Sequence, residues 1–335
     1  MKNEPVLEIE DLKTYFFLDK VVVRALNGVT LSMHKNETLG LVGESGCGKS
    51  LLAMSIIKIF NSPPGDIIAG SIWLQENDSK INIVALEKDN PILRKIRCSK
   101  IGFIFQEPMS SLNPLYKIGK QIIEKIKIDR KISHREAYKK ALQLMKRVGI
   151  SDPEMRLDQY PHHLSGGMRQ RVVIAIAIAC DPIILIADEP TTALDVTVQA
   201  EILNLINELK DEYQTAVLFI THDFGVISKV ANKIAVMYLG KIVEFGDKDE
   251  IFSNPAHPYT KGLLDSIPKI DRSRSEKINS IPGIVPSHTR ELNGCYFYNR
   301  CTKGIDLCKS RYPQFKTELS KTHYANCHLL KEKSL

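Results

Sequence analysis

A glycine-rich segment at residues 43–50 has the residue types and the spacing of a phosphate-binding loop. It reads GESGCGKS, which fits the pattern G-x-x-x-x-G-K-[ST], and it lies between a predicted strand and a predicted helix. Glycines there allow backbone N–H groups to point at phosphate oxygens, and the helix adds the positive end of its dipole. We expect Lys49 to contact the β- and γ-phosphates and Ser50 to ligate Mg²⁺. The predicted nucleotide-binding residues of this segment are Gly43, Ser45, Gly46, Cys47, Gly48, Lys49, Ser50 and Leu51.

Two carboxylates follow the apolar run at residues 183–187, which indicates a buried strand. Asp188 ends this strand and is placed to hold the Mg²⁺ shell. Glu189 comes one residue later, turned differently, and is placed to polarise an attacking water. A strand that ends in Asp-Glu is common by itself, but together with the Lys49 loop it indicates nucleotide hydrolysis.

Three further segments extend this prediction. Residues 164–171 read LSGGMRQR and place a hydroxyl and two glycines (Ser165, Gly166 and Gly167) before a predicted helix, which makes a second anion-binding helix start. Gln106 follows the apolar run IGFIF and can reach a metal or a water, and His222 follows AVLFI and can contact a γ-phosphate. A single Gln or His is usually structural, but the order and spacing here favour catalytic roles.

These segments require strands and helices to position them. Short apolar runs over residues 6–42 predict strands joined by turns, and residues 114–150 are predicted to be helical and are strongly basic. Strand and helix patterns then alternate through residue 245, which favours an α/β fold with a parallel sheet flanked by helices.

The composition is that of a globular protein with room for about two domains. The chain has 335 residues, of which 43% are hydrophobic and 25% charged, and this excludes a disordered, collagen-like or mini-protein class. Lys and Arg outnumber Asp and Glu by 46 to 39, a net charge of +7 that suits a membrane surface or an anionic ligand but does not by itself indicate nucleic acid. Residues 1–12 lack the apolar core of a signal peptide, and Asp181-Pro182 interrupts the most apolar stretch, 172–187. We therefore expect a soluble chain that reaches a membrane through a partner.

After Asn254 the prolines recur, the apolar periodicity fades and cysteines cluster, so we expect a separate appendage. Without an export signal, a metal site is favoured over disulfides. The spacing of the clustered cysteines fits neither a C-x₂₋₄-C zinc knuckle nor a ferredoxin run, and it leaves zinc, an iron–sulfur cluster and free thiols open. The four cysteines are Cys295, Cys301, Cys308 and Cys327.

The order of these motifs (GESGCGKS, Gln106, LSGGMRQR, Asp188-Glu189, ALD and THD) resembles the ATP-binding subunit of ABC transporters over residues 5–250. The LSGGM segment is highly specific for that family. The resemblance implies a P-loop NTPase (RecA-like) nucleotide-binding domain with an antiparallel β subdomain and a helical subdomain at about 108–164. It also implies head-to-tail dimers that enclose two ATP molecules, each between the Lys49 loop of one protomer and Ser165-Gly166-Gly167 of the other.

The same resemblance implies roles for single residues. Gln106 would ligate Mg²⁺ with Ser50 and Asp188 and would link the site to the membrane subunits, whereas Asp195 would make a contact across the dimer. Glu189, His222 and Gln106 would be the catalytic residues. An aromatic side chain would stack on adenine: Phe16 matches that position best, Tyr15 and Phe17 are alternatives, and core packing is equally open. His163 stands where an acidic residue is expected.

The tail resembles that of the ATPases of dipeptide, oligopeptide and nickel importers over residues 254–327. The matching segments are NPAHPYT at 254–260, IPGIVP at 281–286, Gly294-Cys295 and Arg300-Cys301, together with GESGCGKS and FIFQEPMSSLNP. The resemblance implies peptide import, with nickel as the alternative because the ATPase does not touch the cargo. It also implies a 4Fe–4S cluster on Cys295, Cys301, Cys308 and Cys327, with zinc as the alternative. His323 and His328 are candidate substitute ligands, and Cys47, Cys98 and Cys180 are predicted packing or loop residues.

The expected organisation is an ATP-binding domain at 1–253 and a small metal-binding C-terminal extension at 254–335. The implied partners are two transmembrane permease subunits, a second and different ABC ATPase, and indirectly an extracytoplasmic peptide-binding protein, with this chain on the cytoplasmic face of the membrane. A soluble ABC ATPase acting on ribosomes or DNA is the rival. It is disfavoured because the chain has one Lys49-type loop and a short stretch between Gln106 and Leu164, so no nucleic-acid partner is expected.

Overall fold

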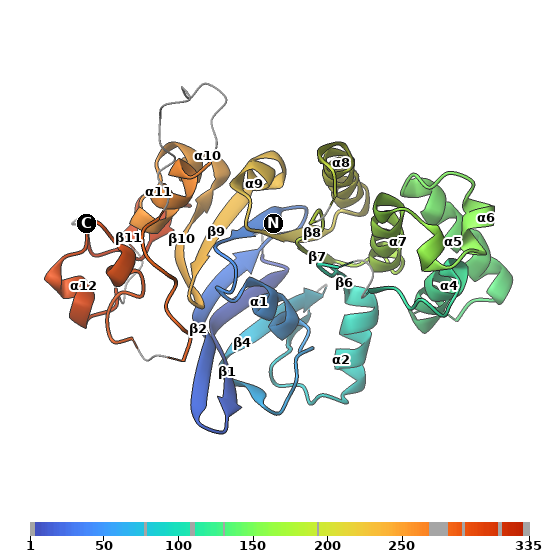
Figure 1. Cartoon of the computed structure of the whole chain (residues 1–335). Coiled ribbons are helices and arrows are strands. Elements are labelled where there is room, and N and C mark those ends of the chain that lie inside the picture. Colours follow the sequence, from blue (N-terminus) through green and yellow to red (C-terminus); the bar gives the residue numbers. More distant parts are fainter. Residues whose placement is uncertain are drawn as a thin grey trace.

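The structure is a computed structural model drawn in Figure 1, and it describes most of the chain. The described residues are 4–76, 79–107, 111–129, 131–192, 194–267, 281–289, 292–313 and 317–330. Residues 108–110 of the FIFQEPMSSLNP segment and Ala193 of the ALD segment lie outside the described residues.

The N-terminal strands form an antiparallel sheet, as the short apolar runs predict. Within the described residues its order is β2 (Val21–Met33), β1 (Leu7–Leu18), β4 (Gly65–Glu76) and β5 (Ser79–Asn82). The apolar side chains on one face of this sheet pack in one core with Leu39 and Leu41 of the central sheet. This core attaches the small sheet to the strand that precedes the phosphate loop.

A second, larger sheet forms the centre of the molecule. In the described part of the chain its order is β11-β12-β10-β9-β3-β8-β7-β6, and β9, β3, β8, β7 and β6 run parallel. Strands β3, β7 and β8 are buried along their whole length, which explains their continuous apolar sequences. The bounds are β3 Thr38–Val42, β6 Ile101–Ile104, β7 Ile184–Asp188, β8 Ala216–Thr221, β9 Lys233–Tyr238 and β10 Lys241–Asp247.

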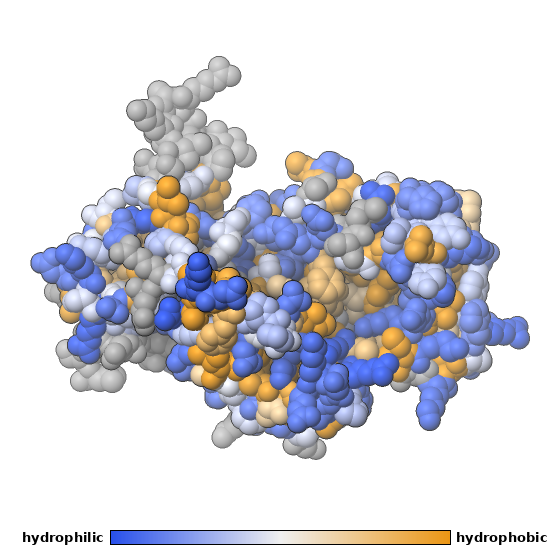
Figure 2. Space-filling view, turned by 60° about the horizontal axis from the view of Figure 1, so that its bottom comes forward, coloured by the Kyte–Doolittle hydropathy of each residue, from blue (hydrophilic) through white to orange (hydrophobic). Residues whose placement is uncertain are grey.

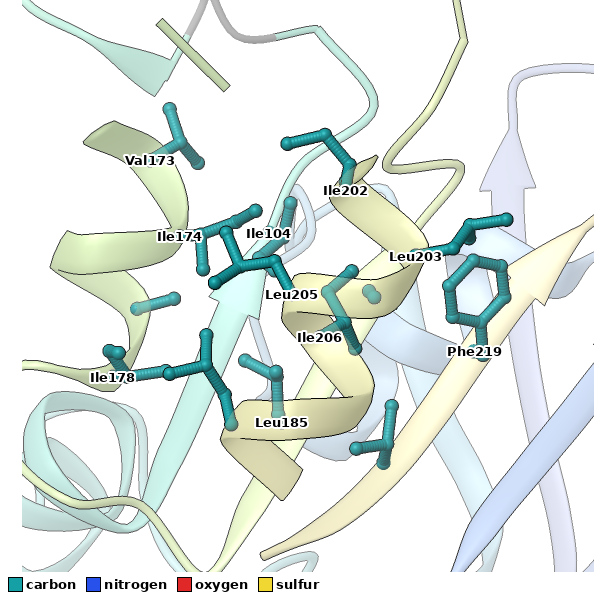
Figure 3. Packing of buried hydrophobic residues seen from close by; sticks show 14 of the residues in the cluster. Ile104, Val173, Ile174, Ile178, Leu185, Ile202, Leu203, Leu205, Ile206 and Phe219 are labelled. Atoms are coloured by element: carbon teal, nitrogen blue, oxygen red, sulfur yellow. The ribbon is translucent and has the colours of Figure 1, made fainter. Parts of the chain in front are cut away.

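Helices cover this sheet. Helix α1 (Lys49–Ile56) follows the phosphate loop, and α7 (Gly166–Ile178), α8 (Val196–Tyr213) and α9 (Phe224–Val230) lie elsewhere along the sheet in Figure 1. Figure 3 shows the packing of Val173, Ile174 and Ile178 of α7 and Ile202, Leu205 and Ile206 of α8 around Ile104 and Leu185 of the sheet. The two helices are thereby packed against β6 and β7, the strands that precede Gln106 and Glu189.

A group of helices stands beyond the β6 edge of the sheet, at the right of Figure 1. The basic segment predicted to be helical forms α4 (Ile118–Asp129) and α5 (His134–Arg147), and α5 begins with a capping box between Ser133 and Glu136. The group continues with α6 (Pro153–Leu157) and the 3₁₀ turn η2 (Pro161–His163). A short helix α2 (Pro91–Lys95) and a π-helical turn η1 (Ile96–Lys100) precede β6.

The C-terminal tail packs against the rest of the molecule and adds strands to its central sheet. Strand β12 (Tyr324–Ala325) pairs antiparallel with β10 and extends the central sheet, and β11 (Thr317–Glu318) pairs with β12. Helix α10 (Lys248–Ser253) comes directly before the tail, whose other elements are α11 (Pro258–Asp265), η3 (Tyr298–Arg300) and α12 (Asp306–Ser310).

Glu244 of β10 fixes the tail to the sheet. This fully buried carboxylate accepts hydrogen bonds from the N–H groups of Ala256 and His257 at 2.6 and 2.9 Å, and from His323 Nε2 at 2.8 Å. Burial alone raises the pKa of Glu244, but these bonds outweigh it and hold the pKa below its ordinary value. Periodicity did not reveal this anchor because it depends on one polar residue rather than on an apolar stripe.

Figure 2 shows hydrophobic side chains interspersed with hydrophilic ones on one face of the molecule. In the part of the chain that the structure describes, no helix has the length and apolar character needed to cross a bilayer.

Candidate active site

The phosphate loop connects β3 to α1, as its sequence predicts. Gly46 and Gly48 have φ angles of +79° and +107°, which favour glycine. A Cβ at Gly43 would lie 2.2 Å from the carbonyl oxygen of Met237, so this position also requires glycine. Lys49 is 5% exposed, and its Nζ donates hydrogen bonds to the carbonyl oxygens of Gly43 and Glu44 at 2.8 and 3.1 Å. The ammonium group is thus folded back over the loop in which the phosphates are expected.

The two residues predicted to hold Mg²⁺ from the loop and from β7 are in contact. The Ser50 hydroxyl donates to Asp188 Oδ1 at 3.1 Å. Burial raises the pKa of Asp188, and the hydrogen bond from Ser50 opposes this only in part. A hydroxyl and a carboxylate are oxygen donors of the kind that Mg²⁺ prefers, so the donor set fits this ion.

Glu189 is the point where the remaining predicted catalytic residues meet. Its carboxylate accepts hydrogen bonds from Gln106 Nε2 at 3.2 Å, from His222 Nδ1 at 3.1 Å and from the Thr192 hydroxyl at 3.0 Å. Gln106, Glu189 and His222 follow β6, β7 and β8, whose carboxyl ends lie side by side because these strands are parallel.

The backbone and the protonation of Glu189 are also set by its surroundings. Its φ is +46°, and its N–H donates to the carbonyl oxygen of Ile220 at 2.9 Å. Burial alone raises the pKa of Glu189, but the hydrogen bonds from His222 and Thr192 outweigh it, so the pKa lies below its usual value. The carboxylate is therefore ionised at neutral pH, which a proton acceptor requires.

The LSGGMRQR segment starts α7, and Asp195 starts α8. The Ser165 hydroxyl accepts a hydrogen bond from Met168 N at 3.3 Å, and Asp195 Oδ1 accepts one from Val198 N at 2.9 Å. A Cβ at Gly167 would lie 2.8 Å from Val198 Cγ1, so the two helix starts pack closely. Within the chain these side chains act as helix caps, and their predicted contacts with a nucleotide on a second protomer stay a prediction.

The aromatic candidates for adenine stacking lie on β1. Phe16 is half-buried and contacts the ring of Phe60 edge-on, with 6.3 Å between the ring centroids. The hydroxyl of Tyr15 donates to Asn27 Oδ1 at 2.8 Å, whereas Phe17 is 51% exposed. These contacts leave the choice of the stacking residue a prediction.

The four tail cysteines influence one another. Burial raises the pKa of Cys295 to about 12, and the electrostatic effect of the other three thiols adds to this. Cys308 and Cys327 are buried, and the N–H of Cys295 donates to the carbonyl oxygen of Cys308 at 2.7 Å. Within the residues that the structure describes, no three His, Cys, Asp or Glu side chains are arranged to hold a single metal ion.

The two histidines considered as substitute ligands have other contacts. His323 Nε2 contacts Glu244 Oε1 at 2.8 Å, and His328 Nε2 donates to the carbonyl oxygen of Arg311 at 2.8 Å. Their ring nitrogens therefore contribute to the packing of the tail.

Sequence reasoning missed several contacts of the site. Thr192 supports Glu189, and a hydroxyl three residues after the glutamate was the available signal. Arg300 and Tyr259 of the tail contact Glu44 in the phosphate loop. Both belong to the tail segments that carried the resemblance, but separations of 256 and 215 residues leave no local pattern that predicts these contacts.

Comparisons with known proteins agree with this geometry. A family model described as ABC transporter matches residues 26–192, and one described as Oligopeptide/dipeptide transporter, C-terminal region, matches residues 243–308. The oligopeptide transport ATP-binding protein AppD of Bacillus subtilis is 46% identical over 315 residues, which cover 94% of this chain and 94% of AppD. The dipeptide transport ATP-binding protein DppD of the same organism is 43% identical, with 97% of this chain and 95% of DppD covered.

A solved structure shows the same fold. The ATP-binding cassette MJ0796, a dimer in a post-hydrolysis state bound to ADP and Pi, has a TM-score of 0.63 and 27% identity, and covers 72% of this chain and 98% of that chain. The site geometry, the matched family models and the relatives lead to one conclusion. The chain belongs to the ATP-binding subunits of ABC transporters, in the group that carries the oligopeptide/dipeptide transporter C-terminal region.

Proposed function

We propose that this chain is the ATP-hydrolysing subunit of an importer of dipeptides or oligopeptides, acting at the cytoplasmic face of the membrane. The observation that carries the proposal is the combination of two parts in one chain. The hydrogen bonds to Glu189 assemble a hydrolysis site, and the tail matches the oligopeptide/dipeptide transporter C-terminal region. Relatives with 43–46% identity over nearly their whole length are named as peptide, oligopeptide or dipeptide transport ATP-binding proteins.

The phosphate loop and the ends of the central strands divide the chemistry between them. Lys49 exchanges its two carbonyl partners for oxygens of the β- and γ-phosphates, and the loop N–H groups bind the remaining phosphate oxygens. Ser50, Asp188 and Gln106 would hold Mg²⁺, which would supply positive charge to the phosphate oxygens. Glu189 accepts a proton from the attacking water. Gln106, His222 and Thr192 orient the carboxylate of Glu189.

The complete site requires two cassettes. Ser165, Gly166, Gly167 and Asp195 complete the nucleotide site of a second ATPase subunit, and that subunit completes the site of this chain. The support is the solved dimer of MJ0796, whose cassette this chain resembles. We further propose that the second subunit is a different ABC ATPase, that Gln106 couples the site to two transmembrane permeases, and that a peptide-binding protein delivers the cargo outside the membrane.

The division of the chain follows the same logic. We propose an ATP-binding domain at 1–253, with a helical subdomain at about 108–164, and a C-terminal extension at 254–335 that packs on it. The region matched at 26–192 lies inside the proposed ATP-binding domain. The region matched at 243–308 begins shortly before the proposed boundary and continues into the extension.

We also propose that Cys295, Cys301, Cys308 and Cys327 hold a 4Fe–4S cluster. The support is the match of the tail to the oligopeptide/dipeptide transporter C-terminal region, together with the close approach of two of these cysteines: the N–H of Cys295 donates to the carbonyl oxygen of Cys308 at 2.7 Å. Burial raises the pKa of Cys295 and of Cys327, so the positive charge of a metal centre would favour their conversion to thiolates.

Metal analysis tests the cluster. Anaerobically purified wild-type protein should contain about four irons and four sulfides per chain, whereas Cys301→Ser should lose them. Cys98→Ser, which changes a cysteine outside the tail, is the matched control and should keep the metal. One equivalent of zinc without sulfide would show that the four cysteines form a zinc site and not a cluster. Protein without metal would show that they are free thiols.

Uptake in cells tests the transport function. Cells that lack this chain should lose uptake of labelled dipeptides or oligopeptides, and wild-type chain should restore it, whereas Lys49→Ala should not. Loss of ⁶³Ni²⁺ uptake with unchanged peptide uptake would assign the chain to a nickel importer and overturn the proposal.

A further inference from the structure

Residues of the C-terminal tail form hydrogen bonds with the phosphate loop. The carboxylate of Glu44, the second residue of the loop, accepts hydrogen bonds from both terminal nitrogens of Arg300 at 2.6 and 2.9 Å. The N–H of Glu44 donates to the hydroxyl oxygen of Tyr259 at 2.9 Å, and His288 Nε2 donates to the carbonyl oxygen of Gly46 at 2.7 Å. Three tail residues therefore contact two residues of the loop.

The contact between Arg300 and Glu44 is fixed on the tail side. The Arg300 side chain is 4% exposed and that of Glu44 27%. Arg300 Nε also donates to the carbonyl oxygen of Pro282 at 3.0 Å, and the guanidinium carbon lies 5.9 Å from the ring centroids of both Tyr238 and Phe297. A bidentate, largely desolvated pair of this kind has one preferred geometry, so it restrains the loop more than an exposed ion pair does.

The charge of Glu44 explains why the loop needs this partner. The loop binds the phosphates of ATP, and a carboxylate within it repels them unless its charge is neutralised. The Glu44 carbonyl oxygen also accepts a hydrogen bond from Lys49 Nζ at 3.1 Å, so the same residue links Arg300 to the lysine that faces the phosphates. Loss of Arg300 leaves an unpaired negative charge in the loop and removes one of the contacts that fix the position of Glu44.

The residues that make these contacts with the loop come from the tail region and not from the ABC transporter match. Arg300, Tyr259 and His288 all lie in residues 243–308, the match to the oligopeptide/dipeptide transporter C-terminal region, whereas Glu44 lies in the ABC transporter match at 26–192. We propose that Arg300 is a positioning residue for ATP binding, which neutralises Glu44 and holds the phosphate loop in its anion-binding conformation. The inference rests on the proposed nucleotide site at residues 43–50.

Calorimetry with the full-length chain and the non-hydrolysable analogue adenylyl imidodiphosphate plus Mg²⁺ tests the inference. Arg300→Gln should raise the dissociation constant at least about tenfold, equal to about 1.4 kcal/mol. Adding Glu44→Gln to Arg300→Gln should restore the affinity to within about threefold of wild type, because the repelling charge is gone. Arg311→Gln, an exposed arginine of the same tail, is the matched control and should bind like wild type.

The double variant separates positioning from a merely structural role. If Arg300 only holds the tail together, Glu44→Gln cannot rescue binding, and an equal loss in the single and double variants would overturn the inference. Affinity of folded Arg300→Gln within about twofold of wild type would also overturn it. If Arg300→Gln does not fold, Arg300→Lys takes its place, with an expected loss of about two- to fivefold that the Glu44→Gln change relieves; an unrelieved loss, or none, contradicts the inference.

The Lys49→Ala variant distinguishes a failure of the proposed nucleotide site from a failure of the proposed role of Arg300. If wild type and Lys49→Ala bind the analogue equally well, the proposed nucleotide site fails. If Lys49→Ala loses binding but Arg300→Gln does not, the site stands and only the role of Arg300 fails.

Discussion

At the scale of single residues, the proposed hydrolysis chemistry depends on Glu189. Its side chain is 12% exposed and accepts hydrogen bonds from Gln106, Thr192 and His222, which come from three different segments. The hydrogen bonds from His222 and Thr192 stabilise the ionised carboxylate, so the pKa of Glu189 lies below its usual value despite burial. The carboxylate is thus both available as a proton acceptor and fixed in direction.

Replacing Glu189 should separate binding from hydrolysis. Glu189→Gln should lower the ATPase rate at least about hundredfold, because an amide cannot accept the proton, while the affinity for ATP stays within about threefold. Steady-state phosphate release and calorimetry measure the two quantities, with the exposed Glu154→Gln as the matched control. A rate within about tenfold of wild type would reject Glu189 as the base.

The site residues that the sequence predicted are those with local signals. Lys49, Asp188 and Glu189 stand in short patterns at the ends of apolar strands, and parallel pairing brings such ends together without further information. The bond between Arg300 and Glu44 has no such signal, because it joins residues 256 positions apart through a tail without periodicity. Contacts of this kind follow from packing, which a single sequence does not display.

At the scale of elements, helix α11 ties the tail to the phosphate loop. His257 caps the helix, since its Nδ1 accepts a hydrogen bond from Tyr259 N at 3.1 Å, and Tyr259 in turn contacts Glu44. His257 is 1% exposed, and burial lowers its pKa from 6.5 to about 4. The cap therefore requires a neutral imidazole.

This cap should make stability fall on mild acidification. Between pH 6.5 and about 4 the unfolded chain binds a proton at His257 that the folded chain does not, so folding weakens as the pH decreases. Between pH 7 and 5 the wild type should lose about 2 kcal/mol more than His257→Asn, which keeps a capping oxygen and does not titrate. Denaturant midpoints of both proteins at the two pH values measure this.

The titration of the neighbouring Glu244 carboxylate lies outside the pH range of this measurement. Glu244 has a folded pKa below its unfolded value of 4.5, so its contribution is present above 4.5 and is lost only as the pH falls further. Equal losses for wild type and His257→Asn between pH 7 and 5 would show that His257 is not the titrating group.

The elements differ in how far the sequence predicts them. Strands β3, β7 and β8 have continuous apolar runs because both of their faces are buried, and each was expected. Strand β12 has two residues, too few for any alternation to show, and its place in the sheet is set by the free edge of β10 and by the buried Glu244. This is why the sequence does not predict that the tail joins the central sheet.

At the scale of the whole molecule, the chain carries the two halves of an ATP site at different places. In the proposed dimer, the phosphate loop and Glu189 would form one half, and the LSGGMRQR segment at the start of α7 would form the other half for a second protomer. Isolated chain should therefore hydrolyse ATP slowly, with a rate per chain that rises with protein concentration or on addition of the partner ATPase. A rate per chain that stays constant from nanomolar to high micromolar protein, with the chain monomeric by light scattering throughout, would contradict this.

The central claim is that ATP hydrolysis by this chain drives peptide import, and reconstituted vesicles test it most directly. The measurement is the ATP-dependent transport of a labelled peptide by vesicles that contain the permeases, the partner ATPase and this chain, compared with vesicles carrying Glu189→Gln. The account predicts peptide transport with wild-type chain and ATP, and none above background with Glu189→Gln. Equal transport by both, or ATP hydrolysis without any peptide transport, would contradict the account.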